Sequence, residues 1–206
     1  MTLEVSGLDA GYDGTPILRG VDLTVNDGEI VGIVGRNGVG KTTLLKAIMG
    51  LLDPDAGTVR VDGTDLTHEP ADVHARSGIG YVPQGRDVFP GLTVEQNLAI
   101  GEGIGDGDET RYEQVYDYFP ILEERADQDA GTMSGGQQQM LAIGRALVGD
   151  PDILVVDEPS EGVQPSIVQS ITADLERINE AFGTTILFVE QNLSVIQGLS
   201  ERCYAI

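Results

Sequence analysis

The chain has 206 residues, of which 40% are hydrophobic, and its 34 acidic and 12 basic residues give a formal net charge of −22. This length and apolar content predict one globular domain over residues 1–206 and exclude a largely disordered chain. The charge argues against nucleic acid as a partner, because phosphate binding needs cationic groups, and it favours a salt-adapted surface over that of an ordinary acidic protein.

Alternating apolar and polar residues at 3–8 and 21–25 predict two half-buried antiparallel strands near the N-terminus. Residues 30–34, with the sequence IVGIV, are continuously apolar, as is typical of a strand buried on both faces. A glycine-rich loop then leads into a helix predicted over 41–49, and a further strand is predicted at 79–82.

The second half of the chain predicts helices followed by more buried strands. Helical spacing of apolar residues runs from about 93 to 149, broken by an acidic, glycine-rich link at 101–107. Apolar runs at 153–156 and 185–189 predict strands, and a helical segment at 167–178 between them predicts a parallel crossover. The expected fold is therefore α/β, with a parallel core sheet, an N-terminal antiparallel subdomain and a helical insert.

The loop after the strand at 30–34 fits the phosphate-binding pattern GxxxxGK[ST]. In such a loop, backbone N–H groups and a helix N-terminus surround the phosphates, Lys41 reaches the β- and γ-phosphates, and the Thr42 hydroxyl binds Mg²⁺. The alternative is a simple glycine-rich turn, but the strand and helix on either side favour the phosphate site. The residues expected to contact the nucleotide are Gly35, Arg36, Asn37, Gly38, Val39, Gly40, Lys41, Thr42 and Thr43.

Two carboxylates, Asp157 and Glu158, follow the apolar run at 153–156. In open α/β sheets the carboxyl ends of the strands line the ligand crevice. We expect Asp157 on the Mg²⁺ side, and Glu158 to orient or deprotonate the water that attacks the γ-phosphate. Alone, such a pair is more often a solvated loop or a helix cap; beside a phosphate loop, the catalytic interpretation is favoured.

Ser134-Gly135-Gly136-Gln137 precedes a predicted helix, and its serine cap and glycines leave a helix N-terminus open to an anion. With Lys41 before it and Asp157-Glu158 after it, this segment resembles the signature motif of the ABC ATPase family. The resemblance covers all 206 residues. It implies a P-loop NTPase that binds and hydrolyses ATP with Mg²⁺, with the signature motif acting on ATP held by a partner subunit.

The resemblance implies roles for other residues by their positions. Tyr12 matches the aromatic residue that stacks on adenine, with a core or turn tyrosine as the alternative. Gln84 matches the glutamine that meets Mg²⁺ and the attacking water. Gln191 stands where the family has a histidine that contacts the γ-phosphate, and an amide there cannot become cationic. Gln164 likewise replaces the usual aspartate in the loop after Glu158.

Three segments, VPQGRDVFPGLTVEQNL, SEGVQPS and FVEQN, resemble importers for branched-chain amino acids and, slightly more closely, for urea and short amides. This implies a second ATPase subunit, identical or paralogous, transmembrane permease subunits and, indirectly, an external solute-binding protein. Residues 86–98 would face the permease through Val88, Phe89 and Leu92, unless these three pack inside the helical insert. The alternatives are a soluble ABC ATPase outside transport and an ATP-binding switch without useful turnover.

The remaining features are interpreted as follows. Cys203 is expected to be a small core residue, and His68 and His74 are expected at the surface. The absence of an apolar run of about 18 residues and of a signal-like N-terminus predicts a cytoplasmic protein. The resemblance to transporter subunits implies that it lies peripherally on the inner face of the membrane. The end of the sequence falls within a predicted strand, which suggests truncated C-terminal strands.

Overall fold

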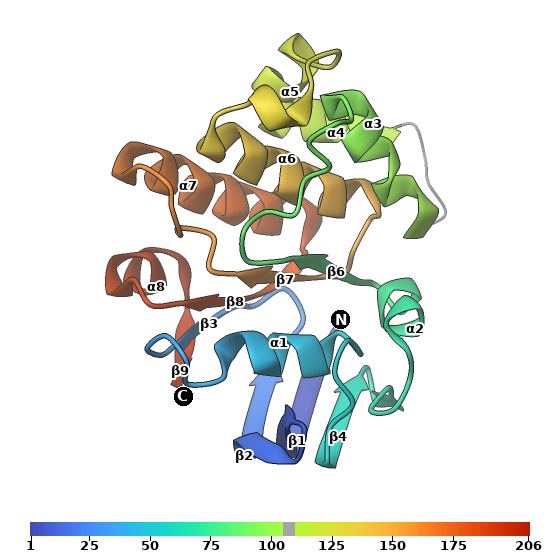
Figure 1. Ribbon diagram of the computed structural model, residues 1–206, viewed down its shortest axis with the longest axis vertical. Helices are drawn as coiled ribbons and strands as arrows, with labels where there is room; N and C mark the ends of the chain where they lie inside the picture. Colours follow the sequence, from blue (N-terminus) through green and yellow to red (C-terminus); the bar gives the residue numbers. More distant parts are fainter. Residues whose placement is uncertain (105–109) are drawn as a thin grey trace.

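A five-stranded parallel sheet lies at the centre of the computed structural model (Figure 1). The strands follow the order β6 (Ile79–Val82), β7 (Ile153–Asp157), β8 (Thr185–Glu190), β3 (Ile30–Val34) and β9 (Arg202–Ala205). The structure describes residues 1–104 and 110–206, so the predicted acidic link at 101–107 lies partly outside the described residues. The predicted parallel core sheet is confirmed.

Both faces of the central sheet are buried, which explains why its strands are continuously apolar rather than alternating. On β7, Leu154 and Val156 pack toward helices α6 (Gly135–Val148) and α7 (Pro165–Phe182). Their neighbours Ile153 and Val155 point to the opposite face, toward α1 (Lys41–Ile48). Helix α7 connects the parallel strands β7 and β8, so the crossover predicted from the sequence is present.

A smaller antiparallel sheet packs on the α1 side of the molecule (Figure 1). Its strands follow the order β2 (Thr15–Val25), β1 (Leu3–Tyr12), β4 (Ala56–Val61) and β5 (Thr64–Asp65). The alternating residues Leu3 and Val5 are buried in the same cluster as Leu44 and Leu45 of α1. This sheet is the predicted antiparallel subdomain, and it places Tyr12, at the end of β1, near the start of α1.

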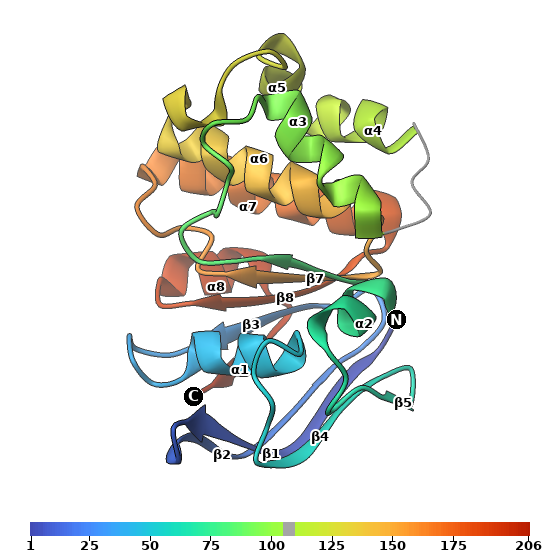
Figure 2. The same cartoon turned by 45° about the vertical axis from the view of Figure 1, so that its right-hand side comes forward.

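The region between β6 and β7 is helical, and its first helices lie beyond α6 on the side away from the antiparallel sheet (Figure 2). These elements are α3 (Val94–Ala99), η1 (Gly101–Ile104), α4 (Thr110–Tyr118), α5 (Pro120–Glu124) and η2 (Ala130–Thr132). The two other helices are α2 (Ala71–Arg76) and α8 (Leu193–Leu199). Within the described residues, no helix combines the length and the apolar character needed to cross a membrane.

Two expectations about single residues are wrong. Cys203 is exposed rather than buried, because side chains alternate along β9 and its neighbours Arg202 and Tyr204 take the inward face, where they contact the backbone of Thr24. His74 is fully buried, because α2 packs its ring against the end of α1, where Nδ1 lies 2.8 Å from the carbonyl oxygen of Ile48. His68 is exposed, as expected.

Candidate nucleotide site

The loop between β3 and α1 has the backbone geometry of an anion cradle. Gly38 and Gly40 have φ values of 81° and 111°, which side chains rarely tolerate. Gly40 is the N-cap residue of α1 and makes no side-chain cap hydrogen bond. The N–H groups in the first turn of α1 therefore remain available to a ligand, with the positive end of the helix dipole behind them.

Lys41 is the buried cation of this loop. Its Nζ donates to the carbonyl oxygens of Gly35 and Arg36 at 2.9 and 3.1 Å, which holds the side chain across the loop. Nζ also forms an ion pair with Glu158, with Nζ and Oε1 2.9 Å apart and both side chains at most 5% exposed. The predicted phosphate-binding lysine and the predicted catalytic carboxylate are thus in direct contact, which the sequence did not reveal.

Asp157 and Glu158 lie at the carboxyl end of β7, with unpaired buried oxygens. Oδ1 of Asp157 and Oε2 of Glu158 are buried and have no hydrogen-bond partner in the described part of the chain. Burial raises the pKa of Asp157, although a hydrogen bond with Thr42 opposes this and the charge of Glu158 adds to it. Free carboxylate oxygens beside a threonine hydroxyl are the ligands that Mg²⁺ prefers, so these residues fit that ion.

Lys41, Thr42 and Glu158 border a hollow of about 330 Å³. Its lining residues come from β1, β2, the phosphate loop, α1 and the segments after β6 and β7: Tyr12, Ile17, Asn37, Gly38, Gly40, Lys41, Thr42, Thr43, Gln84 and Glu158. Tyr12 is 42% exposed at its mouth, so its ring is free for a ligand to stack on. The fold therefore brings together residues that the sequence separates by more than 140 positions.

Of the predicted site residues, Gly35, Arg36, Val39 and Asp157 are not among those that line the hollow. Two glutamines are also placed differently from the prediction. Gln84 borders the hollow, but its side chain is engaged elsewhere, because Nε2 donates to Oε2 of Glu161 at 2.8 Å. Gln191 follows β8 with an exposed side chain and is not among the lining residues of the hollow. Its backbone N–H donates to the carboxylate of Glu190.

Ser134, Gly135, Gly136 and Gln137 form the start of α6, away from the hollow of their own chain. Ser134 Oγ accepts from the Gln137 N–H at 3.4 Å, and the Gln137 side chain accepts from the Ser134 N–H at 2.9 Å, which is a capping box. Gly136 packs closely, since a Cβ there would lie 2.6 Å from Ile167. None of the four lines the hollow.

Sequence reasoning missed two charged residues that support the site without lining the hollow. Glu190 is fully buried, and its carboxylate accepts backbone N–H groups of Ser160, Gln191 and Asn192 at 2.8 to 3.1 Å. Its position after a buried strand, as for Asp157, was the available signal. Arg86 contacts the backbone after Glu158, and its signal was weaker: a basic residue in a chain that has few.

The chain is similar to proteins of known families. A family model described as ABC transporter matches residues 18–161. BraG of Pseudomonas aeruginosa, a high-affinity branched-chain amino acid transport ATP-binding protein, is 43% identical and covers 95% of this chain and 84% of BraG. LivF of Archaeoglobus fulgidus, a probable branched-chain amino acid transport ATP-binding protein, is 38% identical, with 96% and 84% covered. The lipopolysaccharide export ATP-binding protein LptB of Escherichia coli is 35% identical, with 100% and 86% covered.

Solved structures agree on the architecture. A nucleotide-free ATP-binding cassette from an ABC transporter superposes with a TM-score of 0.89 at 28% identity, covering 100% of this chain and 88% of that one. A dimeric bacterial ABC transporter cassette gives 0.88 at 27% identity, covering 99% and 94%. The family match, these relatives and the geometry of the phosphate loop lead to one conclusion: the chain belongs to the ABC transporter family, as an ATP-binding and ATP-hydrolysing subunit.

Proposed function

We propose that this chain powers an importer for branched-chain amino acids, as a cytoplasmic subunit bound to the inner face of the membrane. The similarity to BraG carries this proposal, because 43% identity extends over 95% of the chain. LivF points to the same cargo, whereas the export protein LptB is the more distant of the three. Urea and short amides remain the alternative cargo, since the segments that resemble importers resemble both types.

The cargo is tested by transport into sealed vesicles. The complex of this chain with its permease would be reconstituted with ATP on the side of the ATPase and the solute-binding protein on the other side. We expect ATP-dependent accumulation of labelled leucine, lost in Glu158→Gln. Accumulation of urea instead would identify urea as the cargo. Movement of leucine from the ATP side to the side of the solute-binding protein would contradict import. ATP turnover by a chain that binds no permease would favour the soluble ABC ATPase.

Nucleotide binding in this proposal uses the loop and both sheets. Residues 35–43 surround the triphosphate, with Lys41 as the cation between the β- and γ-phosphates. Tyr12 stacks on the adenine from the antiparallel sheet. Because Lys41 is paired with Glu158 in this structure, phosphate oxygens must displace that carboxylate from Nζ. ATP binding would therefore release Glu158 for its catalytic role.

Hydrolysis depends on the groups at the ends of β7 and β8. Thr42, Asp157 and Gln84 would hold Mg²⁺, which neutralises charge on the phosphate oxygens. Glu158 orients the attacking water and accepts its proton. Gln191 lies outside the hollow in this structure, so its side chain would have to turn toward the γ-phosphate to donate a hydrogen bond there, a weaker one than a cationic imidazole would give.

A partner subunit is required in this proposal. Ser134, the N-cap of α6, is exposed, and the first turn of this helix carries no acidic residue, so the helix N-terminus suits an anion. Because Ser134 to Gln137 do not line the hollow of their own chain, that anion would be the triphosphate held by a second subunit. Two such subunits, identical or paralogous, would form two composite sites, in line with the dimeric cassette of similar structure.

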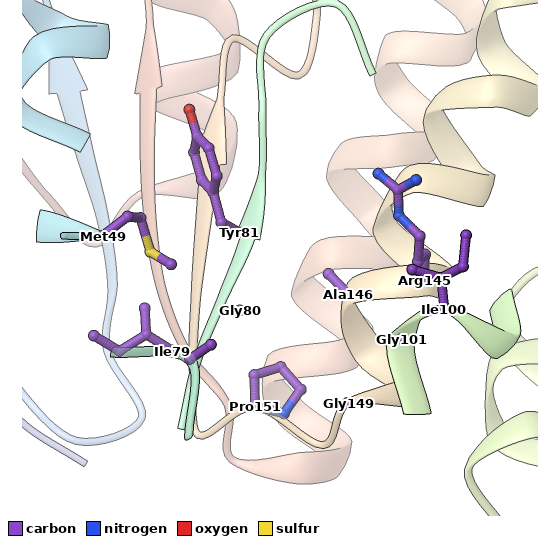
Figure 3. A pocket seen from close by; sticks show the side chains of 11 residues that line it. Met49, Ile79, Gly80, Tyr81, Ile100, Gly101, Arg145, Ala146, Gly149 and Pro151 are labelled. Atoms are coloured by element: carbon purple, nitrogen blue, oxygen red, sulfur yellow. The ribbon is translucent and has the colours of Figure 1, made fainter. Parts of the chain in front are cut away.

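A mainly apolar groove of about 160 Å³ offers a contact for the permease (Figure 3). Met49 and Tyr81 lie on one side of it and Ile100 and Arg145 on the other. Ile100 is 43% exposed at the groove. The groove lies between the sheet and the helical region, so an inserted permease segment would contact both.

Residues 86–98 supply an exposed aromatic ring near this groove. Phe89 is 46% exposed, and the guanidinium of Arg145 lies 5.3 Å from the centre of its ring. Val88, in contrast, packs against the buried core, and Leu92 is only partly exposed, so Phe89 is the residue proposed for the permease contact. Asn97 is buried and bonds to both the N–H and the carbonyl of Phe89, which holds this loop in place.

Phe89→Asp should separate ATP hydrolysis from transport. A charge at this exposed ring would lower permease-stimulated ATP turnover and transport by about tenfold or more, as at other interface hot spots. Basal turnover of the isolated subunit should not change, because Phe89 does not line the nucleotide hollow. Phe89→Leu, which stays apolar, and Thr64→Asp, on the distant β5, are the controls. Unaltered stimulation in Phe89→Asp would contradict the permease contact.

The acidic surface predicts a salt requirement. With a net charge of −22, self-repulsion should destabilise the folded chain at low ionic strength. Raising KCl from about 0.1 to about 2 M shortens the screening length to a few ångströms and should raise Tm by several degrees. Thermal unfolding followed by circular dichroism measures this. A Tm that stays constant or falls over that range would favour an ordinary acidic protein.

A further inference from the structure

The turn that follows Gln84 has an unusual backbone. Gly85, Arg86 and Asp87 have φ values of 82°, 76° and 44°, so three consecutive residues are left-handed and two of them carry side chains. Each non-glycine residue in this region costs about 1 kcal/mol or more. Such a conformation persists only where surrounding contacts hold it.

Three hydrogen-bonding groups hold this turn: the Arg86 side chain, the side chain of the preceding Gln84 and the backbone carbonyl of Asp87. Nη2 of Arg86 donates to the carbonyl oxygens of Glu161 and Gly162, both at 3.2 Å. Gln84, on the other side of the turn, donates to the Glu161 side chain. The carbonyl of Asp87 accepts from Arg145 of α6 at 2.9 Å. The turn is therefore tied to the segment after β7 and to α6.

Glu161, one of the two residues that Arg86 contacts, also holds Glu158. The N–H of Glu161 donates to the carbonyl of Glu158 at 3.0 Å, which closes a turn over 158–161. Glu158 is itself left-handed, with φ of 46°. One hydrogen-bonded chain thus runs from the Arg86 guanidinium through the Glu161 backbone to Glu158.

The Arg86 guanidinium also contacts the first turn of α6, but this contact is electrostatically unfavourable and does not explain its position. A Cβ at Gly135 would lie 3.2 Å from Nη1 and Nη2, so the guanidinium packs on the first turn of α6. The N-terminal end of a helix repels a cation. The bonds to the two carbonyls must offset this repulsion, which identifies them as the contacts that place Arg86.

We propose that Arg86 is a positioning residue for ATP hydrolysis, which holds the turn at 158–162 so that the Glu158 carboxylate stays directed into the hollow. This inference rests on the proposed role of Glu158. Arg86 does not line the hollow, so its effect is on the placement of the carboxylate and not on nucleotide binding.

The test compares kcat with the affinity for Mg-ATP in Arg86→Ala, Arg86→Lys and Arg125→Ala. Because misplacing a catalytic group by about 1 Å can cost a hundredfold, Arg86→Ala should lower kcat by about ten- to a hundredfold. The Kd of Mg-ATP should stay within about twofold. Arg86→Lys should recover part of kcat, because an ammonium can still donate to these carbonyls. Arg125→Ala removes an exposed arginine of the helical region and should match wild type.

Gly162→Ala tests the contact between Arg86 and the segment after Glu158 independently, from the Gly162 side. A Cβ there would lie 3.3 Å from Nη2 of Arg86, at a backbone φ of 64°. It should lower kcat, and it should add little to the effect of Arg86→Ala if both act through one contact.

Failure of the positioning role of Arg86 and failure of the catalytic role of Glu158 give different results. If Arg86→Ala keeps kcat within twofold, or lowers kcat and affinity in equal measure, the positioning role is wrong. Wild type and Glu158→Gln are measured beside it. Wild-type turnover in Glu158→Gln would overturn the proposed role of Glu158 and this inference together. A normal Arg86→Ala beside an inactive Glu158→Gln would overturn this inference alone.

Discussion

Replacing Glu158 with glutamine should stop ATP turnover while strengthening ATP binding. A general base typically contributes about a hundredfold or more to the rate, and the amide cannot accept a proton. The carboxylate also lies 2.9 Å from Nζ of Lys41 in this structure, so the substitution frees that ammonium for the phosphates and removes a negative charge beside them. We therefore expect kcat to fall by at least about a hundredfold and Kd for ATP to fall severalfold.

Single-turnover hydrolysis and equilibrium nucleotide binding measure the two effects separately. Glu180→Gln, which neutralises an exposed carboxylate on α7, should match wild type in both. Light scattering with ATP should show a lasting dimer for Glu158→Gln if composite sites form. If Glu158→Gln hydrolyses ATP at the wild-type rate, Glu158 is not the base. If the wild type itself binds ATP without turnover, the chain is an ATP-dependent switch.

Replacing Lys41 with alanine should remove ATP binding and also destabilise the nucleotide-free chain. The loss of Nζ takes away the cation of the phosphate loop and its bonds to Gly35 and Arg36. It also leaves the Glu158 carboxylate, only 5% exposed, without its ion-pair partner. Breaking a buried pair from one side commonly costs about 3 kcal/mol or more, so Tm should fall clearly.

The double variant Lys41→Ala with Glu158→Gln separates the two effects. Without the unpaired buried charge, it should recover much of the lost stability and still bind no ATP. Urea unfolding gives the first quantity, and equilibrium binding of a fluorescent ATP analogue gives the second. Equal stability of the single and double variants would show that the ion pair contributes nothing to folding. Tight ATP binding by Lys41→Ala would show that the phosphate loop is not part of the ATP site.

Local sequence patterns were sufficient to predict the main helices and strands of the fold. The continuous apolar run of β3, the alternation in β1 and the glycine-rich loop before α1 each reflect the environment of residues close together in sequence. The boundaries were less accurate: β1 continues to Tyr12, and α7 runs from Pro165 to Phe182, beyond the predicted 167–178. A helix or strand extends beyond the residues with the clearest hydrophobic pattern, because its end residues also make stabilising contacts.

The burial of single polar residues depended on packing between distant elements. His74 lies in a polar segment of sequence, yet its ring fills the space against Gly50 at the end of α1. Cys203 is apolar, yet it lies on the outward face of β9. Residue type predicts burial on average, and the side of a helix or strand on which a residue falls decides the individual case.

By itself, the sequence determined the phosphate loop, the carboxylates after β7 and the capped start of α6, because each is a short motif whose chemistry depends on adjacent residues. Only the tertiary structure decided which of these meet. It paired Lys41 with Glu158, turned Gln84 toward Glu161, and placed Arg86 on the backbone that holds Glu158. These contacts join residues about 75 to 117 positions apart in the sequence. The order of the strands in the sheet brings such residues together, and no local sequence pattern encodes that order.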